Sequence, residues 1–403
     1  MLLEYNLNNT SDLLNEANKS ILFTTIRPDI VMEHGKGMYL WDTNGKGYLD
    51  FMGGWAVTSL GHCPDVLIEA LTNQSNTLIN ASPSFYNKPM IEFSKLLTSN
   101  SCFDRVFFAS SGSEANEGAI KLARKYGAKF LNGAYEIITA VNSFHGRTLA
   151  TMSATGKKAW KDLYEPKVPG FKHVPLNDLD AIKTSITSNT CAIMLEPIQG
   201  EGGVNELSKS YIKALRNICR ERKILLIFDE VQTGIGRTGD LFAYQYYEVE
   251  PDIMTLAKGI GGGYPLSALL AKEALNIFEP GDQGGTYSAQ PLGMAAGIAV
   301  VSEVINKNLS HNAKVQGEYI IEKLNEIKNT YGLKNIRGRG LLIAFDIPEN
   351  KGSEIVIKCL DEGLLLNSPR PSTIRLMPPL IITHKETDNM ITILSKVLDM
   401  TLL

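Results

Sequence analysis

The sequence has few of the features that mark secreted, metal-binding, membrane or nucleic-acid-binding proteins. Its five cysteines are odd in number, widely scattered and without a Cys-x-x-Cys pair, which indicates reduced thiols in a cytoplasmic protein. Its six histidines show neither HExxH nor HxxxH spacing, so we predict no metal site. No apolar run approaches the roughly 18 residues of a membrane span. A net charge of −3 without a basic block predicts neither nucleic-acid nor membrane-surface partners.

The chain is long enough to need more than one hydrophobic core. Its 403 residues are 44% hydrophobic and 21% charged, a globular composition that should divide into two or three domains. Residues 1–50 are predicted to form an N-terminal arm and a segment of a smaller domain, with a hairpin turning at Asn44-Gly45. Residues 51–300 should form the large domain, and residues 301–403 a second, α+β domain. Residues 1–10 lack a positive segment and a continuous apolar run, so we expect no secretory signal.

Strand-like and helix-like segments alternate between about residue 100 and residue 271. Short apolar runs at 105–109, 136–141, 192–195, 225–229, 253–256 and 266–271 read as strands, with helical patterns between several of them. Such alternation predicts a mostly parallel sheet with helices on both faces. Ligands of such sheets bind beyond the carboxyl ends of the strands.

Two of these strands carry the residues around which the chain is organised. The run Leu225–Phe228 ends in Asp229, with Gln232 three residues later, and Lys258 follows the strand at 253–256. A buried aspartate is costly unless a cation meets it, and a lysine in an apolar setting can become a nucleophile toward carbonyls. An acid facing a cationic ring nitrogen and a lysine holding an aldehyde would suit pyridoxal phosphate (PLP). Taken alone, the same residues could be a helix-capping Asp and a surface Lys.

Two turns are candidates for binding a phosphate. Ser111-Gly112-Ser113 stands at a strand-to-helix turn, where backbone N–H groups, a hydroxyl and a helix N-terminus could form an anion site. The alternative is a plain helix cap assisted by Glu114. Thr286, in Gly284-Gly285-Thr286-Tyr287, offers a second hydroxyl in what is otherwise a turn.

Three further segments carry aromatic or charged side chains in unusual places. Phe144-His145-Gly146-Arg147 follows a strand, so that an aromatic face could stack on a flat cofactor and an Arg fork could hold a carboxylate, although a packed Phe and a surface Arg would fit as well. Glu201 lies in the Gly-rich stretch 199–203, where the chain should make a close approach. Arg375 is a charge inside an apolar strand and needs an anionic partner if it is buried.

The ordered combination of these segments resembles the class III (ω-amino acid) aminotransferases, which are PLP enzymes of fold type I. The resemblance spans nearly the whole chain and rests on these motifs: Gly61-His62, Ser111-Gly112-Ser113-Glu114-Ala115-Asn116, Phe144-His145-Gly146-Arg147-Thr148, the segments 196–203 and 229–234, Leu256-Ala257-Lys258-Gly259, Gly285-Thr286-Tyr287 and Arg375-Leu376-Met377-Pro378-Pro379. It implies an α/β large domain with a mostly parallel sheet of the seven-stranded type flanked by helices, and a smaller α+β domain.

The resemblance also implies roles in holding the cofactor. Lys258 would form the Schiff base with PLP and carry the proton, and Asp229 would pair with the pyridinium nitrogen. Gln232 would contact the ring hydroxyl, supported by Glu196. The remaining cofactor-binding residues that it implies are Phe144 on one ring face beside His145, Val231 on the other face, Ser111, Gly112 and Ser113 on the phosphate, and Thr286 from the neighbouring subunit. The resemblance therefore also implies an obligate homodimer, whose two subunits would share each site.

The substrate residues implied by the resemblance must serve two half-reactions. Arg375 would hold the α-carboxylate of glutamate or 2-oxoglutarate, and Glu201 would pair with Arg375 when that carboxylate is absent, since an unpaired buried charge is expensive. Arg147 would take the distal carboxylate. Within the class, the motifs look most like the acetylornithine and ornithine branch, which implies transfer of a δ-amino group to 2-oxoglutarate in a ping-pong cycle belonging to arginine biosynthesis.

Trp55 departs from the pattern of that branch. An aliphatic residue is expected there in acetylornithine enzymes and a tyrosine in ornithine enzymes, so an indole could narrow the pocket, stack on an acyl group or merely pack the entrance. Acetylornithine, succinylornithine, succinyl-diaminopimelate and ornithine therefore all stay open as donors, with 4-aminobutyrate a further alternative. A glutamate 1-semialdehyde aminomutase is disfavoured, because it has no need of the carboxylate switch. A PLP-fold binding or scaffold protein is disfavoured because Lys258, Asp229 and Gln232 are all present.

Overall fold

The computed structural model describes residues 9–403, so most of the stretch inspected for a secretory signal lies outside the described residues. Its largest element is a seven-stranded sheet of order β4-β12-β11-β10-β7-β5-β6. The strands are β4 (Arg105–Ala109), β5 (Glu136–Ala140), β6 (Phe171–Val174), β7 (Thr190–Leu195), β10 (Leu225–Asp229), β11 (Ile253–Leu256) and β12 (Ser267–Ala271). Neighbouring strands from β11 to β6 run parallel, and β12 is antiparallel to both its neighbours. The predicted mostly parallel sheet is confirmed.

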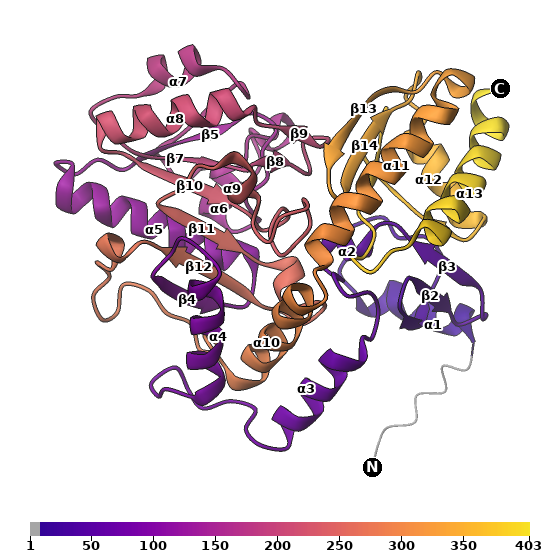
Figure 1. Ribbon diagram of the computed structural model, residues 1–403, viewed down its shortest axis with the longest axis horizontal. Coiled ribbons are helices and arrows are strands. Elements are labelled where there is room, and N and C mark those ends of the chain that lie inside the picture. Colours follow the sequence, from indigo (N-terminus) through magenta and orange to yellow (C-terminus); the bar gives the residue numbers. More distant parts are fainter. Residues whose placement is uncertain (1–8) are drawn as a thin grey trace.

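Helices cover this sheet, and two of them begin at well-formed N-caps. The Ser111 hydroxyl accepts from Glu114 N at 3.3 Å at the start of α5 (Gly112–Phe130), which packs on β11 and β12. Ser208 caps α8 (Lys209–Arg222) in the same way, accepting from Tyr211 N at 3.2 Å. Each cap satisfies a backbone donor that the helix itself cannot, and so fixes where the helix begins. Figure 1 shows α5, α7 and α8 around the sheet.

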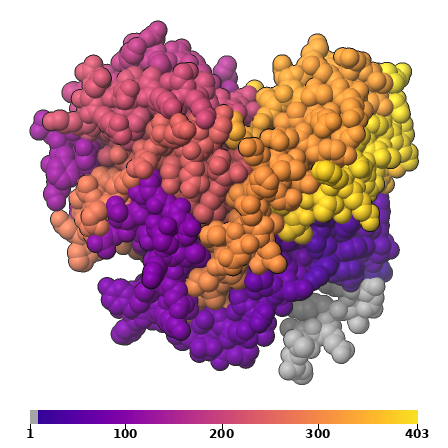
Figure 2. All heavy atoms as spheres, viewed as in Figure 1, coloured from indigo at the N-terminus to yellow at the C-terminus, as the bar shows by residue number. Residues whose placement is uncertain are grey.

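A four-stranded sheet joins the two ends of the chain. The predicted hairpin is present as β2 (Tyr39–Asp42) and β3 (Gly47–Asp50), which pair antiparallel, and Gly45 adopts the φ of 80° that its turn requires. The sheet also contains β1 (Met32–Lys36) and β15 (Leu364–Leu365), and β15 runs parallel to β3. Figure 2 accordingly shows the indigo N-terminal strands lying against the yellow end of the chain.

The C-terminal part forms an antiparallel sheet covered by long helices. The strand order is β13-β14-β17-β16, with β13 (Lys334–Arg339), β14 (Leu342–Asp346), β16 (Asn367–Arg370) and β17 (Thr373–Leu376). The helices are α11 (Leu309–Tyr331), α12 (Gly352–Asp361) and α13 (His384–Leu402). Residues 301–403 thus contain both the strands and the helices that the predicted α+β domain requires. Arg375 lies in β17, which pairs with β14 at Ala344.

The remaining elements connect these sheets. They are α1 (Thr10–Ser20), α2 (Gly53–Ala56), α3 (Asp65–Ser75), α4 (Lys88–Ser99), α6 (Leu149–Ala154), α7 (Leu179–Ser185), β8 (Ile198–Gln199), β9 (Asn205–Glu206), α9 (Ala243–Tyr247) and α10 (Pro291–Asn306). Short 3₁₀ turns lie at Lys158–Trp160, Lys258–Ile260 and Glu273–Leu275. No helix among residues 9–403 has both the length and the apolar character needed to cross a membrane.

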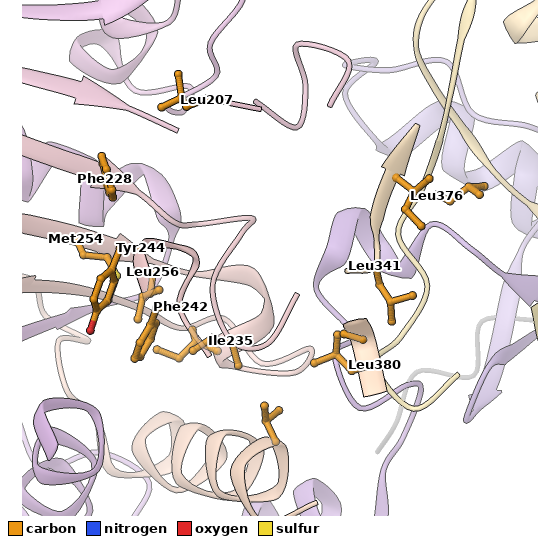
Figure 3. Close-up of a cluster of buried hydrophobic side chains, with 14 of the residues drawn as sticks. Leu207, Phe228, Ile235, Phe242, Tyr244, Met254, Leu256, Leu341, Leu376 and Leu380 are labelled. Carbon is orange, nitrogen blue, oxygen red and sulfur yellow. The ribbon is translucent and has the colours of Figure 1, made fainter. Parts of the chain in front are cut away.

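One apolar core continues from the large sheet into the C-terminal sheet. Phe228 on β10 and Leu256 on β11 belong to the same buried cluster as Leu341 and Leu376, which lie beside and within the C-terminal sheet (Figure 3). A close-packed core has few voids and is hard to deform. Its continuity therefore holds β17, with Arg375, at a fixed place relative to β10. The core thus positions Asp229, at the end of β10, and Arg375, on β17, although they are far apart in the chain.

Candidate active site

The cavity that gathers most of the predicted site residues lies where the parallel strands end. It has a volume of about 380 Å³, and its lining residues follow the carboxyl ends of β4, β5, β7, β10 and β11. This is the location that the sheet type predicts. The predicted site residues that line it are Ser111, Gly112, Ser113, Phe144, His145, Glu196, Glu201, Asp229, Val231, Gln232 and Lys258.

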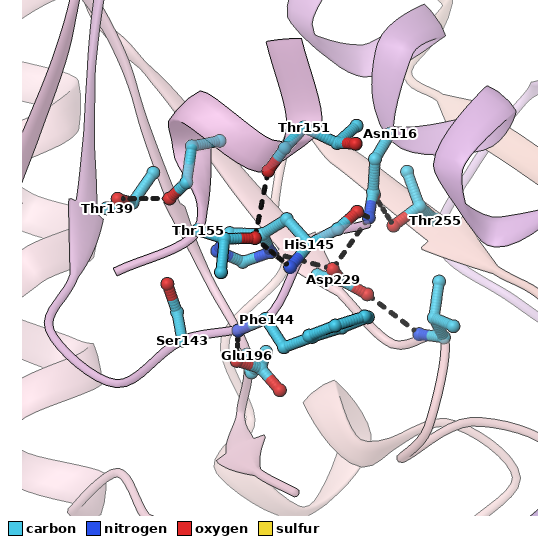
Figure 4. Close-up of polar contacts among 12 residues, drawn as sticks. Asn116, Thr139, Ser143, Phe144, His145, Thr151, Thr155, Glu196, Asp229 and Thr255 are labelled. Carbon is cyan, nitrogen blue, oxygen red and sulfur yellow. Dashed lines mark hydrogen bonds and ion pairs between the residues drawn. The ribbon is translucent and has the colours of Figure 1, made fainter. Parts of the chain in front are cut away.

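Asp229 forms the floor of the cavity. It is only 3% exposed, and its Oδ2 accepts from His145 Nδ1 and from Asn116 Nδ2, both at 2.8 Å. Its Oδ1 accepts from Val231 N at 3.0 Å. Three donors therefore hold a buried carboxylate in one orientation, as burial of a charge requires. Figure 4 shows this network around Asp229.

His145 extends the network away from the cavity. Burial by itself would lower the pKa of His145, but the hydrogen bond and charge of Asp229 outweigh burial and raise that pKa. Its backbone N–H donates to Thr155 Oγ1 at 2.9 Å, while its Nε2 is buried without a partner. Asn116 is fixed in turn, because Thr255 Oγ1 donates to Asn116 Oδ1 at 2.6 Å. Asp229 is thus held by side chains that have few alternatives.

Lys258 approaches the same cavity from the turn after β11. Its φ of 48° is in the left-handed region, which a non-glycine residue adopts only when its surroundings impose it. Burial lowers the pKa of Lys258 to about 8, even though Glu201, Asp229 and Glu196 all favour the charged form. A neutral amine is therefore accessible near physiological pH, and that is the form that attacks a carbonyl.

The N-terminus of α5 supplies a site for an anion. Gly112 and Ser113 are the first residues of this 19-residue helix and both line the cavity. A side chain at Gly112 would place its Cβ 3.0 Å from Val231 Cγ1, so the backbone lies close to the residue predicted to cover one ring face. The Ser111 hydroxyl is used as the helix cap, which is the plain alternative foreseen for this turn. Cap and anion site coexist, because the free N–H groups remain at the helix end.

Phe144 and Glu196 are linked through the backbone. The Phe144 N–H donates to Glu196 Oε1 at 2.9 Å, and Gly200 N donates to Glu196 Oε2 at 3.4 Å. Burial raises the pKa of Glu196 to about 7. We expected Glu196 to orient Gln232, but its hydrogen bonds go to these two amides instead. Glu196 fixes the segment that carries the Phe144 ring.

The other end of the cavity is built around Arg375 and Glu201. Arg375 is fully buried, and its Nη2 lies 2.7 Å from Glu201 Oε1, so the predicted ion pair is present. Asn367 Oδ1 accepts from Arg375 Nε at 3.0 Å and from Nη2 at 2.7 Å, and Gln232 Oε1 accepts from Nη1 at 3.4 Å. Burial alone would raise the pKa of Glu201, but the charge of Arg375 lowers it. A Cβ at Gly200 would collide with Gln232 Oε1, which explains the glycine.

Four predicted residues are not among those that line this cavity: Arg375, which contacts the lining residues Glu201 and Gln232, and three residues that are more exposed. Arg147 is exposed, its backbone N–H donates to Ser113 Oγ at 3.2 Å, and its guanidinium lies 5.3 Å from the Trp160 ring centroid. Trp55 is 50% exposed, on a left-handed turn, and its neighbour Val57 reaches the cavity. Thr286 is exposed on the segment after β12 and outside the cavity of its own chain.

Sequence reasoning missed three residues that contact the predicted ones. Asn116 was part of a quoted motif, and its place in the first turns of a helix beginning at the cavity was a usable signal. Asn367 accepts hydrogen bonds from Arg375, but nothing in its local sequence indicates this role. Only the pairing of β16 with β17 brings Asn367 beside Arg375. Lys157 follows Gly156 in an ordinary lysine pair, yet its Nζ lies 3.5 Å from Glu201 Oε2.

The fold and the site together define a class of protein. The family model of the class III aminotransferases matches residues 24–398. The chain therefore belongs to this family, and it is a PLP-dependent aminotransferase of fold type I. Among individual enzymes, it is 50% identical to the acetylornithine aminotransferase of Ralstonia nicotianae, over 94% of this chain and 97% of that protein. The acetylornithine aminotransferase of Caldanaerobacter subterraneus is 48% identical, with the same coverage.

Solved structures give the same family. The ornithine aminotransferase of Toxoplasma gondii superposes with a TM-score of 0.94 at 31% identity, covering 98% of this chain and 96% of that one. A further structure of that enzyme shows partial occupancy of PLP at the active site. The acetylornithine aminotransferase of Elizabethkingia anophelis superposes with a TM-score of 0.87 at 30% identity, covering 97% of this chain and 99% of that one.

The cavity of this chain fits the cofactor. Its volume of about 380 Å³ falls in the range of small-molecule sites. Gln232 Nε2 is a buried donor without a partner, which a ring oxygen of PLP would satisfy. The lining supplies an anion site at α5, a carboxylate at Asp229 and an amine at Lys258, the groups that would meet the phosphate, ring nitrogen and aldehyde of PLP.

Proposed function

We propose that this enzyme transfers the δ-amino group of N²-acetylornithine to 2-oxoglutarate, giving N-acetylglutamate 5-semialdehyde and glutamate. The single observation that carries the proposal is the Glu201–Arg375 pair at 2.7 Å. A transaminase whose two substrates both carried an α-carboxylate at the reacting carbon would need only the arginine. A carboxylate stationed on that arginine suits an enzyme that must also accept a terminal amine. The names and identities of its relatives support acetylornithine as that amine.

The residues would divide the work as follows. When bound, PLP supplies the aldehyde and the electron-withdrawing ring that make proton removal from the amine-bearing carbon possible. Lys258 would hold and move that proton, which a pKa near 8 supports. Asp229, held in place by its three donors, would pair with the ring nitrogen and keep it protonated. Gly112 and Ser113 would bind the phosphate, and Phe144 and Val231 would enclose the ring.

Glu201 and Arg375 would adapt the site to each half-reaction. With a terminal amine, the pair stays closed and presents little net charge to the substrate. With glutamate or 2-oxoglutarate, the substrate carboxylate replaces Glu201 on Arg375, while Asn367 keeps the guanidinium in place. Arg147, at the exposed rim, would take the distal carboxylate in both half-reactions.

Ornithine is a second candidate donor, because the Toxoplasma gondii ornithine enzyme superposes with a TM-score of 0.94. A donor panel decides between them: kcat/KM is measured for acetylornithine, ornithine, succinyl-diaminopimelate and 4-aminobutyrate with 2-oxoglutarate as acceptor. We expect acetylornithine to lead by at least about tenfold, the discrimination that one extra apolar or hydrogen-bonding contact supplies. A larger value for any other donor refutes the assignment.

We further propose an obligate homodimer in which Thr286 completes the phosphate site of the partner subunit. In support, Thr286 lies outside the cavity of its own chain, on a surface with exposed apolar side chains at Phe85, Tyr86, Ile91 and Tyr287. Such a surface is typical of an interface. Mixing Lys258→Ala with Thr286→Ala subunits tests it. A shared site regenerates one intact centre in each mixed dimer, whereas a Thr286 acting within its own chain gives no recovery.

We also propose a cytoplasmic location, supported by five free cysteines, and a division at residues 1–50, 51–300 and 301–403. The pairing of β3 with β15 supports grouping the first segment with the last. The second boundary falls within α10, which continues to Asn306. Limited proteolysis would test the division.

A further inference from the structure

Lys157 is a cation that the proposed mechanism does not use, although it touches a residue that the mechanism moves. It follows Gly156, beyond α6, and its Nζ lies 3.5 Å from Glu201 Oε2. Arg375 holds the other oxygen, Oε1, at 2.7 Å. The Glu201 carboxylate therefore spans two cations, one from β17 and one from the segment beside α6.

The position of Lys157 is set by aromatic rings. Its Nζ lies 4.9 Å from the centroid of Phe144 and 5.2 Å from that of Trp160, and these two rings contact each other edge to face. Cation–π contacts of this kind hold an ammonium in place without neutralising it. Phe144 is in turn fixed by the bond from its N–H to Glu196. The ammonium is consequently held beside Phe144, which lines the cavity.

The two cations differ in how far they are from solvent. Arg375 is 0% exposed at its side chain, whereas Lys157 is 27% exposed and Glu201 22%. A carboxylate that leaves Arg375 can thus move outward toward Lys157 without losing all ionic partners. Without such a partner it would leave as an uncompensated, partly buried charge, which is the costly outcome.

The charges balance when the cluster is counted with a substrate. With a substrate carboxylate on Arg375, the cluster holds two carboxylates, that of the substrate and that of Glu201. Two cations, Arg375 and Lys157, match them. Without Lys157, Arg375 would be the one cation of this cluster in contact with the two carboxylates, and like charges brought together in a site of low polarity repel strongly.

We propose that Lys157 is the positioning residue that receives the Glu201 carboxylate when a substrate carboxylate occupies Arg375. It thereby sets how well the site accepts glutamate and 2-oxoglutarate relative to the terminal amine. This inference rests on the carboxylate switch of the proposed function. Lys157 acts through Glu201 and does not contact the substrate.

The test compares Lys157→Gln with Lys157→Arg and with the matched control Lys158→Gln. Lys158 is exposed, stands next in the chain and makes no ion pair among the described residues. Each variant is made with Glu201 intact and with Glu201→Gln. Two quantities are measured on the PLP-loaded enzyme: the Kd of glutarate, a non-reacting five-carbon dicarboxylate, by calorimetry, and the single-turnover rates of both half-reactions.

With Glu201 intact, Lys157→Gln is expected to weaken glutarate binding and to slow the half-reaction of glutamate and 2-oxoglutarate by about five- to tenfold, the effect of one partly buried ion pair. The amine half-reaction should change by less than about twofold, Lys157→Arg should restore binding, and Lys158→Gln should have no effect. In the Glu201→Gln background there is no carboxylate to receive, so Lys157→Gln should no longer matter.

Each other outcome overturns the inference in its own way. Equal losses in both half-reactions would make Lys157 a structural residue. An undiminished effect in the Glu201→Gln background would mean that Lys157 contacts the dicarboxylate directly. If Glu201→Gln tightens glutarate binding but Lys157→Gln changes nothing, the switch stands without Lys157. If Glu201→Gln leaves glutarate binding unchanged, the switch itself fails and the proposed function loses its main support.

Discussion

The two ends of the active-site cavity are built on different principles. At the cofactor end, Asp229 of β10, His145 from the segment after β5 and Asn116 of α5 are all buried and are joined by hydrogen bonds of 2.8 Å. At the substrate end, Glu201 lies on a loop and shares two cations from separate parts of the chain, and it is 22% exposed. The first arrangement allows one geometry, whereas the second offers its carboxylate two places.

The difference teaches where reaction type and substrate choice reside. A charge that must stabilise the same group in every turnover benefits from a preorganised, fully satisfied network. A charge that must be present for one substrate and absent for the other benefits from an exchangeable partner. Mutations at the cofactor end should therefore damage both half-reactions alike, and mutations at the substrate end should separate them.

The largest effect is expected for Lys258→Ala, which removes the amine shared by both half-reactions. Turnover should fall by at least about 10⁴-fold, because no other positioned group can carry the proton. The decrease should be equal for the amine donor and for glutamate in single-turnover kinetics. An unchanged circular-dichroism spectrum is the control for folding. Residual transamination above a hundredth of wild type would refute the role of Lys258.

The pH dependence of Lys258 provides the second test of the cofactor end. Burial lowers the pKa of its amine to about 8 from an ordinary value near 10.5, so the neutral form gains population as pH rises through 8. The rate at which the cofactor-free protein is reconstituted with PLP should rise with pH, with a midpoint near pH 8. The rate at which lysines of the unfolded chain react with PLP should have its midpoint at about pH 10.4. Coinciding midpoints would show that the cavity does not lower this pKa.

Asp229→Asn tests the rigid network itself. Asparagine offers one acceptor and one donor group where three donors converge, so it removes the charge and turns its NH₂ group either toward His145 and Asn116 or toward the Val231 N–H. We expect kcat/KM to fall by about a hundredfold in both directions, the equivalent of one lost charged hydrogen bond. The pKa of His145, which Asp229 raises, should fall in an NMR titration. A selective effect on one substrate would break the contrast between the two ends.

Arg375→Ala should separate the half-reactions. The 2-oxoglutarate and glutamate steps should slow by about 30- to 100-fold, because a buried, bidentate carboxylate partner is lost. The amine step should slow by less than about fivefold, because Glu201 can still pair with Lys157. Single-turnover rates for each substrate provide the measurement. Equal losses would mean that the substrate end is as rigid as the cofactor end.

Sequence alone could predict one end of the site better than the other. Asp229 and Lys258 stand at the ends of apolar runs, so local pattern and sheet type place them together in one cleft. Asn367 and Lys157 have no such signal, because an irregular strand pairing and a turn after α6 bring them to Arg375 and Glu201. Short elements that sequence reasoning missed, such as the four-residue β6, have too few residues for a clear pattern. They depend on long-range packing that no local window contains.

Substitutions of Trp55 should have the smallest effect on activity, and they test whether this residue belongs to the substrate end of the cavity. It has φ 62° and ψ 50°, within a left-handed turn formed with Gly54, and its indole is half exposed outside the cavity. A left-handed conformation costs an L-residue about 1–2 kcal/mol, so Trp55→Gly should be more stable to thermal unfolding than Trp55→Ala. Because both variants lack the indole, they should share one donor preference, within about threefold of wild type for acetylornithine against ornithine. A shift of more than about tenfold in that ratio, equal in both variants, would show that the indole contacts the donor and place Trp55 at the substrate end.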